Sequence, residues 1–391
     1  MIPDNKDDFQ MVAKTFHGLE EVLAGEIRSL GGKDIQLLNR AVRFSGNKSF
    51  LYKANIYLRT ALRILLPVIE TDIKNQIDLY NRVREYEWEK HLQPGMTLAV
   101  DTFLNSSAFT NSQFVSLRTK DAIVDRLRDK SGRRPSVKKS DPDLYVNVHL
   151  VSNKLTVSLD TSGSSLHKRG YRKGDVEAPL NETLAAGMIM LTGWTGETDF
   201  YDPMCGSGTL GIEAALIARR IPPGIFRKKY AFEQSPDFEA DMFEAIIDNV
   251  EERKWEGNII SSDISRQAVQ VAMRNAREAS LHKSIQFLGV DFLKYPKVEE
   301  GAVAILNPPY GQRLIKPEII RFYKAIGDIL KRSFTGSEIW IISANLEALK
   351  HIGLRPSMKY KLFNGALECG YNRYNVYQGS KKQKYSRSQK E

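Results

Sequence analysis

The chain has 391 residues, a net charge of +10 and a hydrophobic fraction of 42%, which is typical of a globular protein of roughly two or three domains. No stretch reaches the roughly 20 apolar residues of a membrane span, and the N-terminus lacks the pattern of an export signal, so we expect a cytoplasmic protein without a membrane partner. The 2 cysteines, Cys205 and Cys369, form no CxxC motif, which argues against a disulfide framework and predicts that no metal is bound.

The N-terminal part of the chain reads as two small units. In residues 1–60 we expect a strand, a helix ended by Gly31 and two further strands, at Phe9–Lys14, Leu19–Leu30, Ile35–Leu38 and Ala41–Ser45. In residues 61–165 we expect a strand at Met96–Phe103, a helix at Phe114–Lys130 and a hairpin of Leu144–Leu150 with Leu155–Leu159. Apolar and polar residues alternate on both sides of the hairpin turn, which predicts antiparallel strands with one face in water.

We expect one further domain at residues 166–380. From Glu177 onward, short apolar runs alternate with helical stretches, which is typical of a parallel, doubly wound sheet. The runs are Asp199–Asp202, Asn258–Ser262, Ile285–Val290, Ala302–Leu306 and Glu338–Ser343. Two last runs, Lys359–Phe363 and Arg373–Tyr377, are joined by a turn without a helix and must therefore be antiparallel. We expect a Rossmann-like sheet that ends in an antiparallel hairpin, with Arg219–Lys254 as an inserted helical excursion.

Positive charge gathers in two segments and a tail, which favours a polyanionic partner such as RNA. The first segment, the Arg126–Lys139 cluster, contains Arg126, Arg128, Lys130, Arg133, Arg134, Lys138 and Lys139. The second, the Lys168–Lys173 segment, lies in a stretch (Ser162–Asp175) that reads as a linker or surface loop, and its candidate RNA contacts are Lys168, Arg169, Tyr171, Arg172 and Lys173. Residues 381–391 read as a basic, disordered tail. A merely solvated basic face is the alternative for each of the three.

A glycine-rich loop, Asp202-Pro-Met-Cys-Gly-Ser-Gly-Thr209, follows the first strand of the C-terminal part. Its two glycines allow a tight turn and close approach to a ligand at the edge where open α/β sheets bind ligands. Gly-Lys-Ser/Thr is absent, so this is no phosphate-binding P-loop. The carboxylate of Asp202 would repel a pyrophosphate and suits the cationic amino-acid end of S-adenosylmethionine. From this loop we expect the cofactor contacts Asp202, Pro203, Cys205, Gly206, Ser207, Gly208 and Thr209.

Acidic residues also end the next two strands of this part of the chain. Asp263 is placed to accept hydrogen bonds from the ribose hydroxyls of the cofactor, and Asp291 to accept one from its adenine amino group. Phe292 or Ile264 would pack on the adenine ring. One acid at a strand end is often a helix cap, but three acids at successive strand ends indicate a binding site.

The fourth strand is followed by Asn307-Pro308-Pro309-Tyr310. The lone pair of an aromatic amine is delocalised into its ring, and two acceptors aimed at the amine protons would make it available for methylation. The side-chain oxygen of Asn307 and the carbonyl of Pro308 are such acceptors, the prolines stiffen the backbone, and Tyr310 offers a face on which an extruded base can stack. A proline-rich turn after a buried strand is the alternative.

These motifs, with Leu166–Arg172 and Ala178–Leu184, resemble the THUMP-domain N2-guanine RNA methyltransferases, most closely the bacterial 23S rRNA enzymes. The resemblance covers nearly the whole chain and implies a ferredoxin-like region, a THUMP domain and a Rossmann-like methyltransferase domain. It implies that residues 1–165 bind structured RNA, and that the product is N2-methylguanosine. This chain matches only the N-terminal half of the larger fused members, which carry a second methyltransferase domain.

Three alternatives remain open from the sequence. A tRNA guanine methyltransferase has the same domain plan, and an adenine-N6 methyltransferase uses the same four-residue motif. A protein of a different class, an RNA-binding assembly factor with a vestigial enzyme domain, is disfavoured because Asp202, Asp263, Asp291 and Asn307 are all intact. Carbon-5 methylation of a pyrimidine is disfavoured because neither cysteine is placed as a nucleophile.

Overall fold

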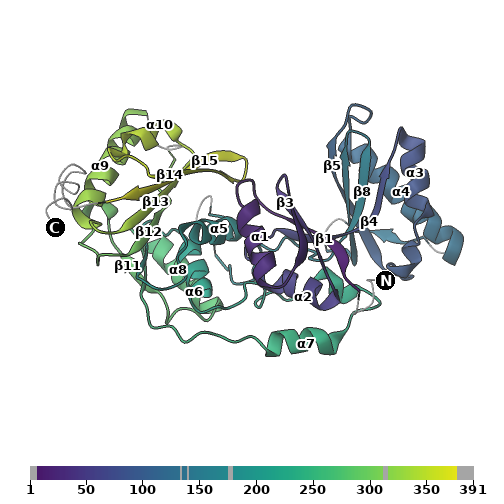
Figure 1. The fold of residues 1–391 in the computed structure, drawn as a ribbon, viewed down its shortest axis with the longest axis horizontal. Coiled ribbons are helices and arrows are strands. Elements are labelled where there is room, and N and C mark those ends of the chain that lie inside the picture. The colour runs from purple at the N-terminus through teal and green to yellow at the C-terminus, as the bar shows by residue number, and fades with distance from the viewer. Residues whose placement is uncertain (1–6, 133, 139–140, 175–178, 311–315, 377–391) are drawn as a thin grey trace. The chain divides into compact units, whose positions relative to one another are not determined.

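The computed structural model describes residues 7–132, 134–138, 141–174, 179–310 and 316–376. The chain forms two compact units (Figure 1). Unit 1 consists of Met1–Thr15, Leu23–Lys168 and Arg227–Val250, and unit 2 of Phe16–Val22, Arg169–Phe226 and Glu251–Glu391. The expected tail at residues 381–391 lies outside the described residues.

Unit 1 begins with a ferredoxin-like arrangement, which confirms the fold expected there. Its elements in chain order are β1 (Phe9–Lys14), α1 (Glu20–Ser29), β2 (Lys33–Leu38), β3 (Ala41–Gly46), α2 (Lys48–Tyr57) and β4 (Arg63–Asp72). The strands are antiparallel and lie in the order β2-β3-β1-β4. Asn47 caps α2 by accepting a hydrogen bond from the backbone N–H of Phe50. The boundary expected at residue 60 falls before β4, so the strand that completes this arrangement lies beyond it.

The rest of unit 1 continues the same sheet. Its elements are α3 (Gln76–Glu85), η1 (Trp88–Lys90), β5 (Thr97–Asn105), α4 (Ser112–Ser131), β6 (Ser136–Val137), β7 (Leu144–Val151) and β8 (Lys154–Asp160). Because β8 pairs with β4, the described residues form one eight-stranded sheet. The expected hairpin is β7 and β8, antiparallel as predicted. Its polar face is only partly in water, since Asn147 is buried and accepts a hydrogen bond from Lys14.

Unit 2 contains a seven-stranded sheet within its described residues, in the order β11-β10-β9-β12-β13-β15-β14. The strands are β9 (Phe200–Asp202), β10 (Ile259–Asp263), β11 (Gln286–Gly289), β12 (Val303–Leu306), β13 (Glu338–Ser343), β14 (Met358–Asn364) and β15 (Leu367–Asn375). The first five are parallel, and β15 runs antiparallel between β13 and β14. The predicted doubly wound sheet with a terminal antiparallel hairpin is confirmed.

Helices cover both faces of the unit 2 sheet. They are α5 (Glu182–Thr192), α6 (Thr209–Ala218), α8 (Arg266–Glu278), α9 (Lys316–Ser333) and α10 (Leu346–Leu349), with η3 (Phe292–Lys294) and η4 (Lys350–Ile352). Neighbouring residues of a strand point to opposite faces. Ile339 of β13 packs with Tyr323 of α9, whereas Trp340 stacks on Tyr371, whose hydroxyl donates to the carbonyl of Met188 in α5. Burial on both sides explains why these strands read as continuous apolar runs.

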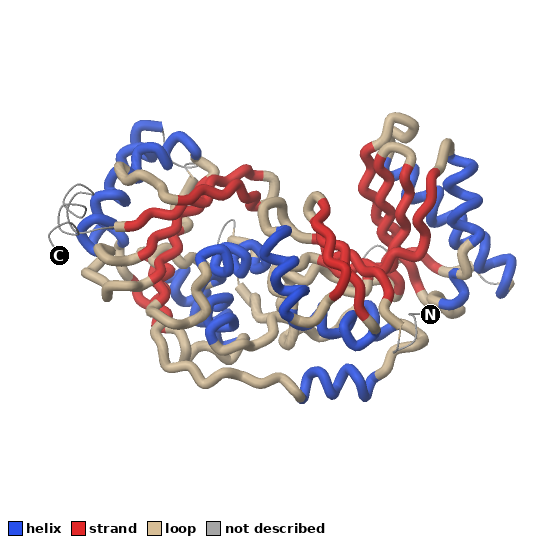
Figure 2. The backbone as a smooth tube through the Cα atoms, in the orientation of Figure 1, coloured by secondary structure: helices blue, strands red, loops and turns tan. Residues whose placement is uncertain are grey.

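The expected excursion between β9 and β10 is less helical than predicted and belongs largely to unit 1. Its helical parts are η2 (Ala231–Gln234) and α7 (Ala240–Asp248), and Figure 2 shows the long loop that leads from α7 toward β10. Arg227–Val250 packs within unit 1, where the ring of Phe232 stacks on Tyr52 at 4.6 Å between centroids. Conversely, Phe16–Val22 belongs to unit 2, where a Cβ added at Gly187 would lie 2.4 Å from Leu19. Each unit therefore includes one segment whose neighbours in the sequence belong to the other unit.

None of the helices in the described ranges combines the length and the apolar character that crossing a lipid bilayer requires.

Candidate active site

The glycine-rich loop joins the carboxyl end of β9 to the start of α6, as predicted. Gly206 and Gly208 have φ angles of 53° and 82°, which L-residues with a side chain rarely adopt. At Gly208 an added Cβ would also lie 2.8 Å from the Cβ of Ala272 in α8. Both positions therefore require glycine, one for conformation and the other also for close packing of the loop on α8.

Asp263 contacts the loop directly. Its carboxylate accepts hydrogen bonds from the backbone N–H of Gly206 (3.0 Å) and of Ser265 (2.9 Å). The N–H of Cys205 donates to the carbonyl of Ser262 on the same strand end (2.8 Å). The end of β10 thus holds the loop in place, a role that the sequence did not reveal because it depends on the pairing of β10 with β9. The half-buried carboxylate has lone pairs left for a ligand.

Asp202 is fully buried at the end of β9. No donor in the described residues makes a well-formed hydrogen bond to either carboxylate oxygen, although the nearby N–H of Gly211 partly stabilises the charge. Burial, and to a smaller extent the charge of Asp263, raise the pKa of Asp202 to about 8. A buried carboxylate without a partner is costly, and a cationic ligand group would satisfy it. The residues present therefore fit the ammonium group of S-adenosylmethionine.

The third acid and its neighbours are arranged differently from the expectation. Asp291 lies two residues beyond β11 and caps η3 by accepting a hydrogen bond from the N–H of Leu293 (2.9 Å). Phe292 is 5% exposed and packs against Tyr295 and Phe334, so its ring is in the core and is not available to cover an adenine. Ile264, 71% exposed directly after Asp263, is the side chain of the pair that can do so.

Asn307–Tyr310 follows β12 at the same sheet edge as the glycine-rich loop. Because β12 pairs in parallel with β9, with Ala304 opposite Tyr201, the two strands end side by side. The hydroxyl of Tyr310 donates to the side-chain oxygen of Asn307 (2.7 Å). Burial raises the pKa of Tyr310, which keeps this hydroxyl protonated as a donor. The atom expected to accept an amine proton thus already accepts one hydrogen bond.

Two polar contacts hold the backbone of this motif. The side-chain amide of Asn345, which caps α10, donates to the carbonyl of Tyr310 (3.3 Å). The hydroxyl of Tyr323 in α9 donates to the carbonyl of Pro309 (3.4 Å). Tyr323 and Asn345 lie on α9 and α10, the helices before and after β13 in the chain. Neither residue belongs to a sequence motif that would have predicted its role in the site.

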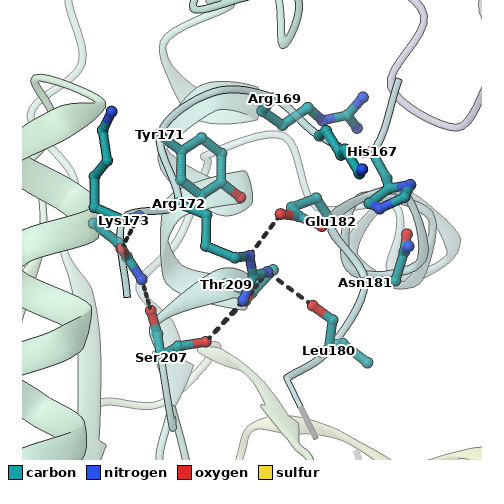
Figure 3. A network of polar contacts seen from close by, with 12 residues as sticks. His167, Arg169, Tyr171, Arg172, Lys173, Leu180, Asn181, Glu182, Ser207 and Thr209 are labelled. Carbon is teal, nitrogen blue, oxygen red and sulfur yellow. Dashed lines mark hydrogen bonds and ion pairs between the residues drawn. The ribbon is translucent and has the colours of Figure 1, made fainter. Parts of the chain in front are cut away.

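The Lys168–Lys173 segment is mostly a buried part of unit 2, and the prediction of a surface loop with RNA contacts is wrong for three of its members. Arg169 and Tyr171 are 2% and 1% exposed, and both donate to the carboxylate of Glu213 in α6, at 3.4 Å and 2.9 Å. Arg172 is partly buried and donates to Glu182 (2.7 Å), as Figure 3 shows. Glu213 is 44 residues from Arg169 in the sequence, and Glu182 is 10 residues from Arg172. Lys168 and Lys173 are exposed and stay candidates.

The Arg126–Lys139 cluster lies at the end of α4 and in the chain that follows it. The guanidinium of Arg126 donates two hydrogen bonds to the carboxylate of Glu89, at 2.7 Å and 3.1 Å. Its charge is therefore paired within unit 1. Arg128 is exposed and pairs with Asp125 (3.0 Å). Lys130, Arg134 and Lys138 are exposed, while Arg133 and Lys139 lie outside the described residues.

The strand order of unit 2 and the position of the glycine-rich loop after β9 are those of the S-adenosylmethionine-dependent methyltransferases. This class was expected from the sequence, and S-adenosylmethionine is the cofactor of the chain.

Comparison with known families identifies the particular group. Residues 169–373 match the RMKL-like methyltransferase domain, residues 74–160 the THUMP domain and residues 10–65 the RlmL ferredoxin-like domain. The chain belongs to the RMKL-like methyltransferase family, in agreement with the resemblance of its motifs.

Relatives of the chain include a putative RNA methyltransferase, slr0064, of Synechocystis, which is 36% identical over 93% of this chain and 96% of its own length. The ribosomal RNA large subunit methyltransferase K/L of Syntrophotalea carbinolica is 37% identical over 90% of this chain but only 51% of its own length. The chain thus spans about half of the K/L relatives. The crystal structure of SMU.472, a putative methyltransferase complexed with SAH, is 30% identical and covers 96% of this chain and 100% of its own, with a TM-score of 0.85.

Proposed function

We propose that this protein transfers a methyl group from S-adenosylmethionine to the exocyclic 2-amino group of a guanine in structured RNA, and that the RNA is large-subunit ribosomal RNA. The observation that carries the proposal is the parallel pairing of β12 with β9, since Asn307 directly follows β12 and the glycine-rich loop follows β9. An amine-directed acceptor at Asn307 would then lie near the methyl donor. The relatives named as ribosomal RNA large subunit methyltransferases favour ribosomal RNA as the substrate. Such a substrate implies the cytoplasm.

In this proposal the side-chain oxygen of Asn307 and the carbonyl of Pro308 accept hydrogen bonds from the two amine protons. These bonds localise the lone pair on the nitrogen and fix its direction. Bound S-adenosylmethionine supplies an electrophilic methyl group. After transfer, the nitrogen is neutralised by losing a proton to water. The side-chain oxygen of Asn307 already accepts a hydrogen bond from the hydroxyl of Tyr310. The amine of the base must therefore either share this acceptor with the hydroxyl or displace the hydroxyl from it. In the second case the ring of Tyr310 is released to lie beside the base.

In this proposal, side chains around the glycine-rich loop bind the cofactor. Asp202 faces the ammonium group as its counter-charge, Asp263 accepts from the ribose hydroxyls, and Asp291 accepts from the adenine amine. Ile264 covers the adenine ring. No covalent nucleophile is needed, and burial raises the pKa of both Cys205 and Cys369, so both thiols stay protonated.

RNA binding is assigned to residues 1–165, which comprise the proposed ferredoxin-like region (1–60) and THUMP domain (61–165), with the methyltransferase domain at 166–380. The match of residues 74–160 to the THUMP domain supports this assignment. The RNA contacts proposed here are the exposed cations Arg128, Lys130, Arg134, Lys138, Lys168 and Lys173.

The test is to incubate the purified protein with radiolabelled S-adenosylmethionine and unmodified large-subunit rRNA or tRNA, and to identify the labelled nucleoside after digestion. We expect N2-methylguanosine in the rRNA, and the loss of label by orders of magnitude for Asn307→Ala with cofactor binding intact. Labelled tRNA would favour the tRNA enzyme, and N6-methyladenosine would refute guanine as the target base. RNA binding without any label would identify the assembly factor, and a fully active Asn307→Ala would refute the catalytic role of that residue.

A further inference from the structure

Among the described residues, the guanidinium of Arg172 donates to at least four acceptors on two segments of unit 2 (Figure 3). On one side lies the start of α5. There Nε donates to a carboxylate oxygen of Glu182 (2.7 Å) and Nη2 donates to the carbonyl of Leu180 (3.0 Å). These two contacts fix the guanidinium plane, since the fork of an arginine can satisfy both only in one orientation.

On the other side lies the cofactor loop. Nη1 donates to the hydroxyl of Ser207 (3.2 Å) and Nη2 to the hydroxyl of Thr209 (3.0 Å). These residues flank Gly208, the N-cap of α6, which has no side chain with which to cap the helix. Ser207 and Thr209 are 3% and 4% exposed, so their hydroxyls are largely shielded from solvent and depend on partners within the protein.

Electrostatics argue that this arginine serves the geometry of the loop and not the stability of α6. A cation beside the first turn of a helix is disfavoured, because the N-terminal end of the helix dipole is positive. Glu182, which is 5% exposed, offsets this cost by pairing with Arg172. The ion pair of Arg172 with Glu182 thus lies where the dipole of α6 disfavours a cation, and Arg172 bonds to the residues on both sides of Gly208. We infer that its role is to hold Gly208 in its left-handed conformation.

A second contact supports the same portion of the loop. The side chain of Asn275, buried in α8, donates to the carbonyls of Ser207 (3.1 Å) and Gly174 (3.0 Å), and accepts from the N–H of Lys173 (2.9 Å). The chain that directly follows Arg172 is therefore anchored to α8, the same helix on which Gly208 packs. By contrast, the side chain of Lys173 is 48% exposed.

We propose that Arg172 is a positioning residue for the cofactor. It holds Ser207–Thr209 in the shape that receives the amino-acid end of S-adenosylmethionine, and it touches neither the cofactor nor the RNA. The sequence places Arg172 in a basic segment and suggests an RNA contact, whereas its four hydrogen bonds link cofactor affinity to the Arg169–Gly174 stretch. This proposal needs only the cofactor, so it stands or falls independently of the base and RNA named above.

The test measures binding of S-adenosylmethionine and of its product S-adenosylhomocysteine by calorimetry, so no RNA is needed. Arg172→Ala and Arg172→Lys are compared with Lys173→Ala, which removes the neighbouring exposed charge, and thermal unfolding without cofactor checks that each variant is folded. We expect the Kd to rise about 10- to 100-fold for Arg172→Ala, less for Arg172→Lys, and to stay unchanged for Lys173→Ala. With an RNA substrate, KM for S-adenosylmethionine should rise by the same factor while kcat changes less than about threefold.

A double-mutant cycle separates positioning from general destabilisation. Ser207→Ala/Thr209→Val removes the hydroxyls that Arg172 holds, so adding Arg172→Ala to this variant should raise the Kd by less than about threefold. Additive losses would show that Arg172 acts elsewhere and would overturn the proposal. So would a folded Arg172→Ala protein with unchanged cofactor affinity, or one with weakened RNA binding alone. If Arg172→Ala does not fold, Arg172→Lys and the hydroxyl variant decide between these outcomes.

Discussion

The two basic segments of this chain look alike in sequence and are opposite in structure. Most of the described cations in the Arg126–Lys139 cluster are exposed, whereas Arg169 and Arg172 of the Lys168–Lys173 segment are turned inward to Glu213 and Glu182. The cause lies in the distribution of acids. Within the described residues, Arg128 pairs with acids of its own helix, Asp125 and Asp129, which are partly exposed. Arg169 and Arg172 instead meet buried acids of α6 and α5. A run of positive charge therefore predicts an RNA-binding surface only if the fold supplies no buried acids for it.

The largest difference between the two segments is expected in the free energy of unfolding of Arg169→Ala. Removing one partner of a buried ion pair leaves the charge of Glu213 uncompensated, which costs about 3–5 kcal/mol. Denaturant unfolding should show this loss, while Arg134→Ala, at an exposed position, should change the free energy of unfolding by less than about 0.5 kcal/mol. The combined variant Arg169→Met/Glu213→Leu should recover much of the stability. Equal, small effects of Arg169→Ala and Arg134→Ala would remove the distinction between the segments.

The buried carboxyl group of Asp202 makes cofactor binding dependent on pH. Its pKa of about 8 lies above the ordinary value of 3.8, so the folded protein without cofactor holds a proton that the unfolded chain releases, and stability falls as pH rises from about 4 to 8. The ammonium of the cofactor favours the ionised form. Affinity should therefore rise by up to about tenfold per pH unit between pH 6 and 7.5, below the pKa of the cofactor's own amine.

Calorimetry in buffers of different ionisation enthalpy should detect the proton that Asp202 releases on cofactor binding. Asp202→Asn, which carries no charge at any pH, is the matched variant and should bind weakly with little pH dependence. A wild-type affinity that is flat from pH 6 to 7.5 would contradict the assignment of Asp202 to the ammonium group.

A smaller effect is expected from the exposed cations in each segment. Neutralising Lys130, Arg134 and Lys138 to Gln should reduce the salt dependence of RNA affinity, by roughly 0.7–0.9 in the slope of log K against log salt for each phosphate that the protein no longer neutralises. Lys168→Gln/Lys173→Gln measures what remains of the second segment as an RNA-binding surface. If the slope changes only in the second variant, the assignment of the first cluster to RNA is wrong.

The smallest effect is expected from Tyr310→Phe. This change removes the hydroxyl that donates to the side-chain oxygen of Asn307 but keeps the ring for stacking, so kcat should stay within a few-fold of wild type. Tyr310→Ala also removes the ring and should lower kcat further. Single-turnover rates with saturating RNA would measure both. A loss in Tyr310→Phe as large as that in Tyr310→Ala would assign the hydroxyl, and not the ring, to the reaction.

Periodicity and strand-end residues were sufficient to predict the sheet of unit 2 and the position of its loop, because parallel strands buried on both faces leave apolar runs that end at the binding edge. Between Ser45 and Met96, where α2, β4 and α3 lie, the residue pattern predicts no element. There β4 carries Pro67 and an irregular register with β8, which interrupts the alternation that would mark a strand. Asn275, Asn345 and Glu213 were missed for another reason: their roles depend on partners far along the chain.

The exchange of segments between the two units sets a condition on synthesis and on dissection of this protein. Unit 1 lacks the aromatic side chains of Phe232, Phe238 and Phe243 until the ribosome has passed Val250, well into the sequence of the methyltransferase sheet. A fragment cut at the junction of Lys168 and Arg169 would leave Tyr52 and its neighbours uncovered in one half, and would deprive the other half of Leu19 against Gly187. The two halves are thus expected to mature together, and neither to be obtained well folded by simple truncation.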